Sequence, residues 1–489
     1  MKLYALLERL DYTLIQGDAG VEIADLVYDS RKVSAGSLFV CMKGTSFDGH
    51  AYVPQAAQAG AAAVVIQDAV DLSSADTSAL TVIRVADTRH VLAVLSAAWF
   101  GYPTEALKVI GITGTKGKTT TSHMVKAILE QAGHKVGLIG TNGVTIGDTH
   151  ELLSNTTPES YSLQSYFSQM LAAGCDMAVI EASSQGFKMH RTDGIFFEAG
   201  VFTNLTPDHI GPGEHESFEE YLSCKAQLFR QCRHGFVNAD DPHAQEVVKG
   251  HTCDLKTFGF SPQDDLFASN ETLTAGDGYL GISFDLSGTV NCRMELDLPG
   301  RFSIYNALSA CAVCSHFGVS AEDMRTALKD IKVKGRIEPI SGPEGSTLII
   351  DYAHNAVSLE SILKTLREYQ PGRLISLFGC GGNRSKIRRY EMGEVSGKLA
   401  DLTIITSDNP RFEEPQDIIN DIKTGIGKTD GAYLEIIDRR EAIQYAVDHA
   451  KAGDIILIAG KGHEDYQEIR GVKYPMDDRT MVLEAIGES

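Results

Sequence analysis

The chain has 489 residues, 43% of them hydrophobic and 22% charged, which is long enough for about three domains and typical of a globular protein. Its net charge of −21 excludes an extended nucleic-acid-binding surface, and we expect no nucleic-acid partner. No apolar run approaches the length of a membrane span, the N-terminus is soon charged, and the nine cysteines lack metal-binding spacing, so we expect a cytoplasmic protein without membrane insertion.

The first predicted domain covers residues 1–103 and is a small α/β unit. Strand patterns at 37–42, 62–66 and 80–85 alternate with helical patterns. The turn Gly101-Tyr102-Pro103 is a plausible linker to the next domain.

A glycine-rich turn follows the first strand of the second predicted domain, which covers residues 104–333. The apolar run 109–113 leads into Gly114-Thr115-Lys116-Gly117, and a helix is predicted over 120–132. Backbone N–H groups of such a loop and the helix N-terminus bind phosphate, Lys118 would reach the terminal phosphates, and Thr119 would bind Mg²⁺. Ile112 stands where the usual signature has glycine, so this is a variant P-loop, and a glycine-rich turn without function is the alternative. The predicted ATP contacts are Gly114, Thr115, Lys116, Gly117, Lys118, Thr119 and Thr120.

The second domain is predicted to hold a mostly parallel, doubly wound sheet, with an antiparallel addition at about 264–298 and a turn at 275–278. Ligands bind at the carboxyl ends of parallel strands. The strand at 177–180 ends at Glu181, and the strand at 199–203 leads into a segment that ends at His209. Thr119, Glu181 and His209 could therefore hold Mg²⁺ together, although histidine is the less common Mg²⁺ ligand.

Lys225 falls on the apolar stripe of a predicted helix that also contains Tyr221 and Leu228. A buried lysine has a lowered pKa, and its neutral amine can act as a nucleophile, for example toward CO₂. The alternative is an aliphatic stem that carries its ammonium group out to water, and the spacing alone favours that alternative.

The third predicted domain, residues 334–489, is Rossmann-like, with strands at 348–351, 374–379, 402–406 and 455–459. Polar residues again follow the strand ends. Arg389 and Arg411 can each bind a carboxylate through two hydrogen bonds, and Glu464 can pair with an ammonium group. This set suits a free amino acid, and simple surface charge is the alternative.

Nine motifs occur in an order that resembles the Mur ligase family: TGTKGKTT (113–120), NTTPES (155–160), EASSQG (181–186), NLTPDH (204–209), LPGRFSIYNALSA (298–310), DYAHN (351–355), GCGG (379–382), SDNPR (407–411) and GKGHEDYQE (460–468). The resemblance covers nearly the whole chain and includes DSRKVSAGSLFVCMKG (29–44). It implies a UDP-sugar domain, a central ATPase and a C-terminal amino-acid domain. It also implies a ligase of peptidoglycan precursor synthesis, in which ATP phosphorylates the D-Glu side-chain carboxylate of UDP-MurNAc-L-Ala-D-Glu and an amine then attacks the acyl phosphate.

The resemblance also implies roles for individual positions. Lys118, Thr119, Glu181 and His209 would serve ATP and magnesium, and Lys225 matches a carbamylated lysine that supports a second Mg²⁺, which reverses the interpretation from spacing. Further nucleotide contacts would come from Asn306, Arg336, Asp351 and His354. The UDP-MurNAc-dipeptide would contact Ser30, Thr156, Thr157, Ser184 and Arg191, and the incoming amino acid would contact Arg389, Asn409, Arg411, Gly460 and Glu464.

Arg411 in DNPR resembles the members that add meso-diaminopimelate, because this acceptor is lysine with one more carboxylate. The chain departs from the family pattern at Asn355, at Asn383-Arg384-Ser385 and after His209, so L-lysine or another acceptor remains the alternative. A folylpolyglutamate synthetase and a non-catalytic nucleotide- and muropeptide-binding paralogue are further alternatives. We expect a monomer.

Overall fold

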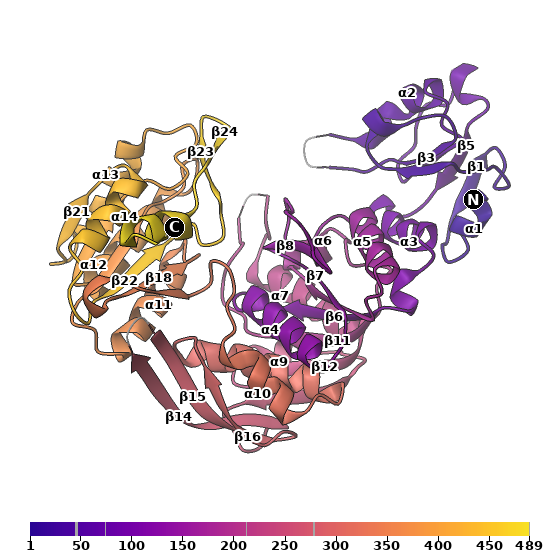
Figure 1. The fold of residues 1–489 in the computed structure, drawn as a ribbon. Coiled ribbons are helices and arrows are strands. Elements are labelled where there is room, and N and C mark those ends of the chain that lie inside the picture. The colour runs from indigo at the N-terminus through magenta and orange to yellow at the C-terminus, as the bar shows by residue number, and fades with distance from the viewer. Residues whose placement is uncertain (45–46, 74, 212, 277–278, 489) are drawn as a thin grey trace. The chain divides into compact units, whose positions relative to one another are not determined.

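The computed structural model describes residues 1–44, 47–73, 75–211, 213–276 and 279–488 (Figure 1). Its internal contacts divide the chain into two compact units. The first contains Met1–Phe258 and Ala312–Phe317, and the second contains Gly259–Cys311 and Gly318–Ser489. The predicted domain limits at 103/104 and 333/334 stay predictions.

The N-terminal part of the first unit is a five-stranded sheet in the order β1-β5-β4-β3-β2, parallel except where β1 pairs with β5. Strands β3 and β4 are fully buried because the predicted runs are almost entirely apolar, and α3 packs on the sheet, whereas β1 is mostly exposed. Its elements are α1 (Leu3–Leu6), β1 (Thr13–Gln16), β2 (Asp25–Val27), η1 (Ser30–Lys32), β3 (Ser37–Val40), η2 (Gly49–Tyr52), α2 (Val53–Gln58), β4 (Ala63–Ile66), η3 (Ala75–Thr77), β5 (Thr81–Arg84), α3 (Thr88–Trp99) and η4 (Pro103–Glu105).

The central sheet of the first unit runs β13-β12-β11-β6-β10-β7-β8-β9. From β13 to β7 the strands are parallel, as predicted, and β8 and β9 add an antiparallel edge. The elements are β6 (Lys108–Thr113), α4 (Lys118–Gln131), β7 (Val136–Gly140), β8 (Gly143–Ile146), β9 (Thr149–Glu151), α5 (Ser160–Ala172), β10 (Met177–Glu181), α6 (Ser184–Lys188), β11 (Phe197–Phe202), α7 (Phe218–Ala226), η5 (Gln227–Arg230), β12 (Cys232–Asn238), α8 (Ala244–Val247) and β13 (Asp254–Gly259). Helices α3 and α5 lie side by side within this unit (Figure 1).

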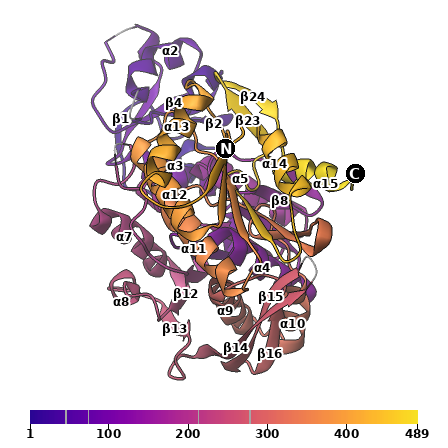
Figure 2. The same ribbon diagram turned by 90° about the vertical axis from the view of Figure 1, so that its left-hand side faces the viewer.

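The second unit begins with antiparallel strands, which confirms the predicted addition. They are β14 (Leu266–Gly276), β15 (Tyr279–Gly288) and β16 (Cys292–Leu296), and α10 packs on β16 (Figure 2). Residues 277 and 278 of the predicted turn lie outside the described residues. The helices that follow are α9 (Arg301–His316), whose residues from Ala312 onward belong to the first unit, and α10 (Ala321–Lys329).

The C-terminal sheet runs β17-β18-β22-β19-β20-β21, and only β17 is antiparallel to its neighbour. This confirms the predicted Rossmann-like domain. The elements are β17 (Glu338–Ser341), η6 (Pro343–Gly345), β18 (Thr347–Asp351), α11 (Ala356–Glu368), β19 (Leu374–Phe378), α12 (Lys386–Leu399), β20 (Leu402–Ile405), α13 (Pro415–Ile426), β21 (Tyr433–Glu435), α14 (Arg439–Asp448), β22 (Ile455–Ala459), β23 (Tyr466–Ile469), β24 (Val472–Pro475) and α15 (Asp478–Ile486).

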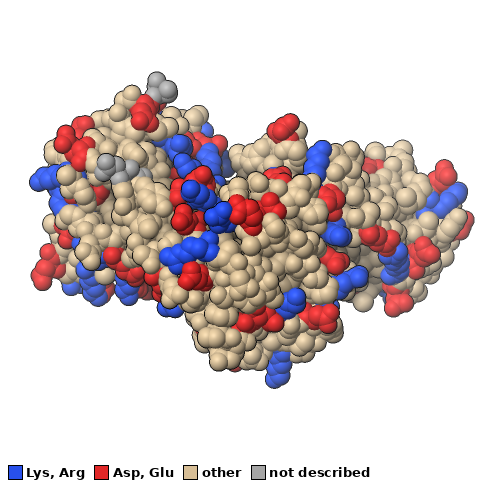
Figure 3. Space-filling model, turned by 60° about the horizontal axis from the view of Figure 1, so that its bottom comes forward, with Lys and Arg blue, Asp and Glu red and all other residues tan. Residues whose placement is uncertain are grey.

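The surface carries both signs of charge. On the face drawn in Figure 3, acidic and basic side chains are interspersed. Among the described residues, none of the helices has the length and apolar character needed to cross a bilayer.

Candidate functional site

The loop between β6 and α4 has the geometry of a phosphate-binding loop. Gly114 and Gly117 have φ of 147° and 85°, values that suit glycine, and a Cβ on Gly114 would lie 2.0 Å from Oγ1 of Thr203. Gly117 is the N-cap of α4, so the helix begins at Lys118, two residues before the predicted start. The Lys118 ammonium donates to the carbonyl oxygens of Gly114 (2.8 Å) and Thr115 (3.1 Å), which folds the side chain over the loop.

Lys225 of α7 contacts the same loop. Its side chain is 1% exposed, and Nζ donates to the Gly114 carbonyl at 2.8 Å and lies 4.5 Å from the Tyr221 ring. The solvent-reaching alternative for Lys225 is therefore wrong. Burial, and then the positive charge of Lys118, lower the pKa of Lys225 well below its ordinary value. The structure thus supports a neutral, nucleophilic amine at this position.

Glu181, at the end of β10, is the acceptor for a group of hydroxyl and amide donors. Its carboxylate accepts from Oγ1 of Thr119 (3.0 Å) and, at the end of β7, from the Thr141 amide (2.9 Å) and hydroxyl (3.0 Å). Glu181 is 1% exposed, so its charge depends on these donors. The structure therefore brings the predicted pair Thr119 and Glu181 together, and their oxygen atoms are of the kind that binds Mg²⁺. Thr141 is a further member that sequence reasoning missed, although the strand-end rule could have found it.

His209 has a different environment from the other predicted metal ligands. Its side chain is 57% exposed, and Nδ1 lies 3.2 Å from a Glu214 oxygen. Asp208 beside it pairs with Lys116 at 3.2 Å. The predicted contribution of His209 to a Mg²⁺ site stays a prediction.

His215 is a buried residue of this site that sequence reasoning did not single out. Its Nε2 lies 2.9 Å from Oγ of Ser184, and its ring packs edge-on against Tyr221. Burial lowers the pKa of His215, so the neutral imidazole is favoured. The sequence feature that could have pointed to His215 is its position two residues before Ser217, the N-cap of α7.

The predicted muropeptide contacts in the first unit, other than Ser30, surround the end of β10. Thr157 Oγ1 donates to the Glu181 carbonyl (2.8 Å), and Thr156 and Thr141 share a hydroxyl contact of 3.0 Å. Arg191 donates to the Thr157 carbonyl (2.9 Å) and to a Glu159 oxygen (2.6 Å). Ser30 lies in η1 and is half-buried.

The amino-acid site predicted for the second unit contains a closed polar network. The Asn409 amide donates to Glu464 at 2.8 Å and its oxygen accepts from Lys461 at 3.1 Å, while Lys461 also donates to Glu464 at 3.0 Å. Lys461 is fully buried and was not among the predicted site residues. Glu464 therefore already has one cationic partner. Gly460 has φ of 111°, and a Cβ there would lie 2.8 Å from Asp408.

Arg411 lies in a loop that is attached to β23. Its backbone N–H donates to the Glu468 carbonyl (3.0 Å) and its own carbonyl accepts from the Arg470 amide (2.7 Å). The side chain donates through Nε to Glu468 (3.1 Å) and through Nη1 to the Gly382 carbonyl (2.8 Å). The Arg411 side chain is 24% exposed.

Arg389 of α12 is not a free cation at this edge of the sheet. It is 1% exposed, and its two terminal nitrogens each donate to a Glu413 oxygen at 2.8 Å, while Nη1 also donates to Asp421 at 2.8 Å. Hydrogen bonding to Arg389 brings the pKa of Glu413 down to about 2. For Arg389 to bind a substrate carboxylate, one of these acids would have to give way.

Three of the four nucleotide contacts predicted in the second unit lie around Tyr352. Asp351 accepts from the Ile337 and Ala353 amides (3.0 and 2.8 Å), and burial raises its pKa. The Arg336 guanidinium lies 4.7 Å from the centre of the Tyr352 ring, and His354 Nδ1 lies 2.9 Å from the Tyr352 carbonyl oxygen. Asn306 lies on α9 and is 8% exposed.

The first unit carries a phosphate-binding loop, and the second carries a polar site of the kind that suits a free amino acid. Together these two sites are typical of a nucleotide-dependent ligase. Comparisons with known proteins agree. The Mur ligase middle domain matches residues 112–314, the "Mur ligase, glutamate ligase domain" matches 335–462, and the "Mur ligase family, catalytic domain" matches 22–100. The chain belongs to the Mur ligase family, and it is an ATP-dependent ligase.

Curated relatives resemble the whole chain. A UDP-N-acetylmuramoyl-L-alanyl-D-glutamate--2,6-diaminopimelate ligase of Clostridium perfringens is 39% identical, covering 99% of both chains. A ligase of the same name from Alkaliphilus metalliredigens is 42% identical, covering 98% of this chain and 96% of its own.

Solved structures share the fold. One titled as a diaminopimelate ligase of the same name has a TM-score of 0.71 at 29% identity and covers 100% of this chain and 99% of its own. A Mycobacterium tuberculosis folylpolyglutamate synthase, at 18% identity and a TM-score of 0.60, covers 75% of this chain and 91% of its own and shares the fold alone.

Proposed function

We propose that this enzyme joins meso-diaminopimelate to the D-Glu side-chain carboxylate of UDP-MurNAc-L-Ala-D-Glu in peptidoglycan precursor synthesis. Relatives that match the chain from end to end carry this activity in their names. The observation that carries the proposal furthest is Arg411, whose side chain is held by Glu468 and Gly382 and is 24% exposed. An acceptor with an additional carboxylate would pair with its guanidinium.

The proposed reaction has two steps. A carboxylate oxygen of D-Glu attacks the γ-phosphorus of ATP, which forms an acyl phosphate and releases ADP. The neutral amine of the acceptor then attacks the acyl carbon, the C–O bond to phosphate breaks, and inorganic phosphate leaves. The protein's contribution is positioning and charge neutralisation, in which Lys118 would move from the loop carbonyls to the phosphate oxygens.

Thr119 and Glu181 are the residues that would hold Mg²⁺, because they already lie together and offer oxygen donors. The ion would neutralise charge on the phosphate oxygens. We further propose that Lys225 is carbamylated. Its neutral amine would attack CO₂, form an N–C bond and release a proton, and the resulting anion would face Lys118 instead of a second ammonium group.

The enzyme would discriminate between acceptors through the free-energy cost of leaving the Arg411 charge unpaired. Lysine has only hydrogen where diaminopimelate has its second carboxylate, so Arg411 would be left without that partner.

We also propose that the domains cover residues 1–103, 104–333 and 334–489 and that the enzyme is a monomer.

The test is phosphate release from ATP with Mg²⁺ and UDP-MurNAc-L-Ala-D-Glu, with meso-diaminopimelate and L-lysine in separate reactions. Turnover with diaminopimelate alone is expected. Turnover with lysine alone would keep the ligase and reject the role given to Arg411. No turnover with either amino acid would favour a different acceptor, selected by the residues near Asn355 and Asn383 at which the chain departs from the family pattern.

Replacing Arg411 tests the same site. Arg411→Ala should lower kcat/KM for diaminopimelate by roughly 30-fold, which corresponds to a lost charged hydrogen bond of about 2 kcal/mol, and should leave the KM for ATP nearly unchanged. Arg470→Ala is the matched control, because Arg470 is 79% exposed and pairs with the exposed Glu414. Equal effects of Arg411→Ala on both substrates would contradict the assignment.

A further inference from the structure

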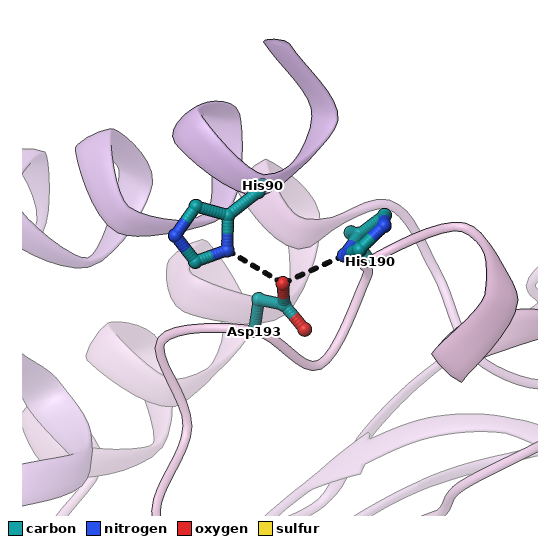
Figure 4. A group of neighbouring side chains, drawn as sticks. All are labelled: His90, His190 and Asp193. Atoms are coloured by element: carbon teal, nitrogen blue, oxygen red, sulfur yellow. Dashed lines mark hydrogen bonds and ion pairs between the residues drawn. The ribbon is translucent and has the colours of Figure 1, made fainter. Parts of the chain in front are cut away.

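A group of two histidines and one aspartate lies outside the site described above. His90 is on α3, and His190 and Asp193 are in the segment after α6 (Figure 4). The Nδ1 atoms of His90 and His190 lie 2.7 and 2.8 Å from the same atom, Oδ2 of Asp193. Two imidazoles that are 100 residues apart in the sequence thus converge on one carboxylate oxygen.

The three atoms are arranged as ligands to one ion would be. Nδ1 of each histidine and the Asp193 oxygen all lie within 4.8 Å of one another. Around a tetrahedral Zn²⁺ with bonds of about 2.0–2.1 Å, ligand atoms lie roughly 3.3 Å apart, so each Nδ1 would have to move away from the Asp193 oxygen by about half an ångström. The histidine side chains are 50% and 38% exposed, so an ion can reach them from solvent and the rings can move.

A second carboxylate lies near the group, at a distance longer than a hydrogen bond. Oδ2 of Asp87 lies 3.7 Å from Nε2 of His190, on the ring edge opposite the one that faces Asp193. A ligating histidine commonly donates its other N–H to such a carboxylate, which orients the ring.

The formal charges around the group favour a cation. The charged neighbours are Asp87 and Arg89 of the α3 N-terminus, and Arg89 donates to the Lys43 carbonyl at 3.2 Å. With Asp87 and Asp193 against one arginine, the local charge favours a cation when the imidazoles are neutral.

Another histidine group in the described residues has less room for an ion. His50 uses both ring nitrogens, because Nδ1 lies 2.6 Å from Asp48 and Nε2 accepts from the Gln67 amide at 3.0 Å. A third group, formed by Glu198, His234 and His316, also brings three such side chains together, but its two ring centroids lie 4.0 Å apart, compared with 6.3 Å for His90 and His190. It provides an internal control for the experiment.

We propose that His90, His190 and Asp193 form a binding site for a divalent transition-metal ion of the Zn²⁺ class, which ties α3 to the segment that precedes and follows Arg191. The ion takes the place of the two imidazole–carboxylate hydrogen bonds, and the proton of each neutral imidazole moves through water from Nδ1 to Nε2, which frees the Nδ1 lone pair for the metal. Because Arg191 lies between two of the ligands, occupancy of the site restrains the residue that we assign to the muropeptide. The metal site itself does not depend on that assignment.

The experiment titrates Co²⁺, and then Zn²⁺ in competition, into metal-free full-length protein at pH 7.5. Co²⁺ bound by nitrogen and oxygen ligands absorbs in the visible range, which reports ligation independently of activity. The wild type should show a saturable visible band, and His90→Asn should weaken that binding by more than about 100-fold, since loss of an outer partner alone costs about 10–100-fold. His316→Asn should leave that site unchanged.

Asp87→Asn is a second, conservative variant. Asp87 is the N-cap of α3, and asparagine caps a helix equally well, so the helix should be retained while the orienting carboxylate is lost. The expected weakening of Co²⁺ binding is about tenfold. The proposal is overturned if the wild type shows no saturable visible band, which would leave a proton-bridged histidine–aspartate group, or if His90→Asn binds as the wild type does.

Discussion

At the residue scale, the amines of Lys118 and Lys225 share one hydrogen-bond acceptor, since each donates to the Gly114 carbonyl at 2.8 Å. Two ammonium groups this close repel each other, and Lys225 is the more buried of the two. Its proton is therefore the easier to lose. A carbamate on Lys225 would convert this repulsion into attraction.

Substitution of Lys225 tests that chemistry. Lys225→Ala should lower kcat by about 100-fold, because the anion that would support a metal ion is lost, and added small carboxylates should restore part of it. Lys225→Arg should be equally slow and should not be rescued, because a guanidinium fills the space and keeps a positive charge. Wild-type turnover in either variant would refute the proposed role.

The pairing of Glu413 with Arg389 predicts a pH dependence. The pKa of Glu413 is lowered from 4.5 to about 2, so its contribution to stability is complete above pH 4.5 and is lost as the pH falls toward 2. Glu413→Gln should therefore lower the urea midpoint at pH 7, and the difference from wild type should shrink below pH 4.5. Glu414→Gln is the control, because its carboxylate is 71% exposed. A difference that stays constant down to pH 3.5 would contradict the assignment.

At the element scale, the packing of α12 on α13 depends on glycine. A Cβ on Gly425 would lie 1.9 Å from the Tyr390 carbonyl oxygen, and one on Gly393 would lie 2.1 Å from that of Ile422. The two backbones therefore approach more closely than side chains allow. This contact sets the position of α12, which carries Arg389.

Gly425→Ala should therefore destabilise the second unit by about 1–3 kcal/mol or more, because the added methyl group forces the helices apart. Gly427→Ala is the matched control. Gly427 is exposed, has φ of −60° and caps the same helix, so alanine there should be neutral or slightly stabilising. Urea unfolding followed by circular dichroism measures both. Equal stability of the two variants would show that the helices can move apart without cost.

For the whole molecule, the net charge of −21 opposes the approach of ATP. Positive charge is supplied only locally, by Lys116, Lys118 and the helix N-terminus of α4. Long-range steering of an anionic substrate by the protein field is therefore not expected.

Salt should accordingly speed the binding of ATP. Raising the ionic strength from about 0.01 to 0.15 M shortens the screening length from about 30 to 8 Å, which removes long-range repulsion and leaves the local contacts. The association rate of a fluorescent ATP analogue, measured by stopped flow, should rise by roughly twofold to fivefold. A fall in rate with salt would show that the local lysines dominate the field at a distance.

The sequence by itself determined the classes of structure and the position of the nucleotide loop. Buried apolar runs followed by glycine and polar residues predict parallel strands and their ligand-bearing ends, because strand burial and loop geometry are local consequences of residue type. The strands at 374–379 and 455–459, the antiparallel addition and the Thr119–Glu181 pair were predictable in this way. The start of α4 was misplaced by two residues because Gly117 occupies a left-handed cap that a pattern does not reveal.

Only the tertiary structure decided which charged groups meet. The burial of Lys225, the pairing of Arg389 with Glu413, and the convergence of His90 and His190 on Asp193 each join residues on different elements. Residue type states what a side chain can bind, but the packing of distant elements sets its distance to each partner and its access to water. Those two quantities decide whether an arginine faces a substrate or an internal carboxylate, and whether a lysine keeps its proton.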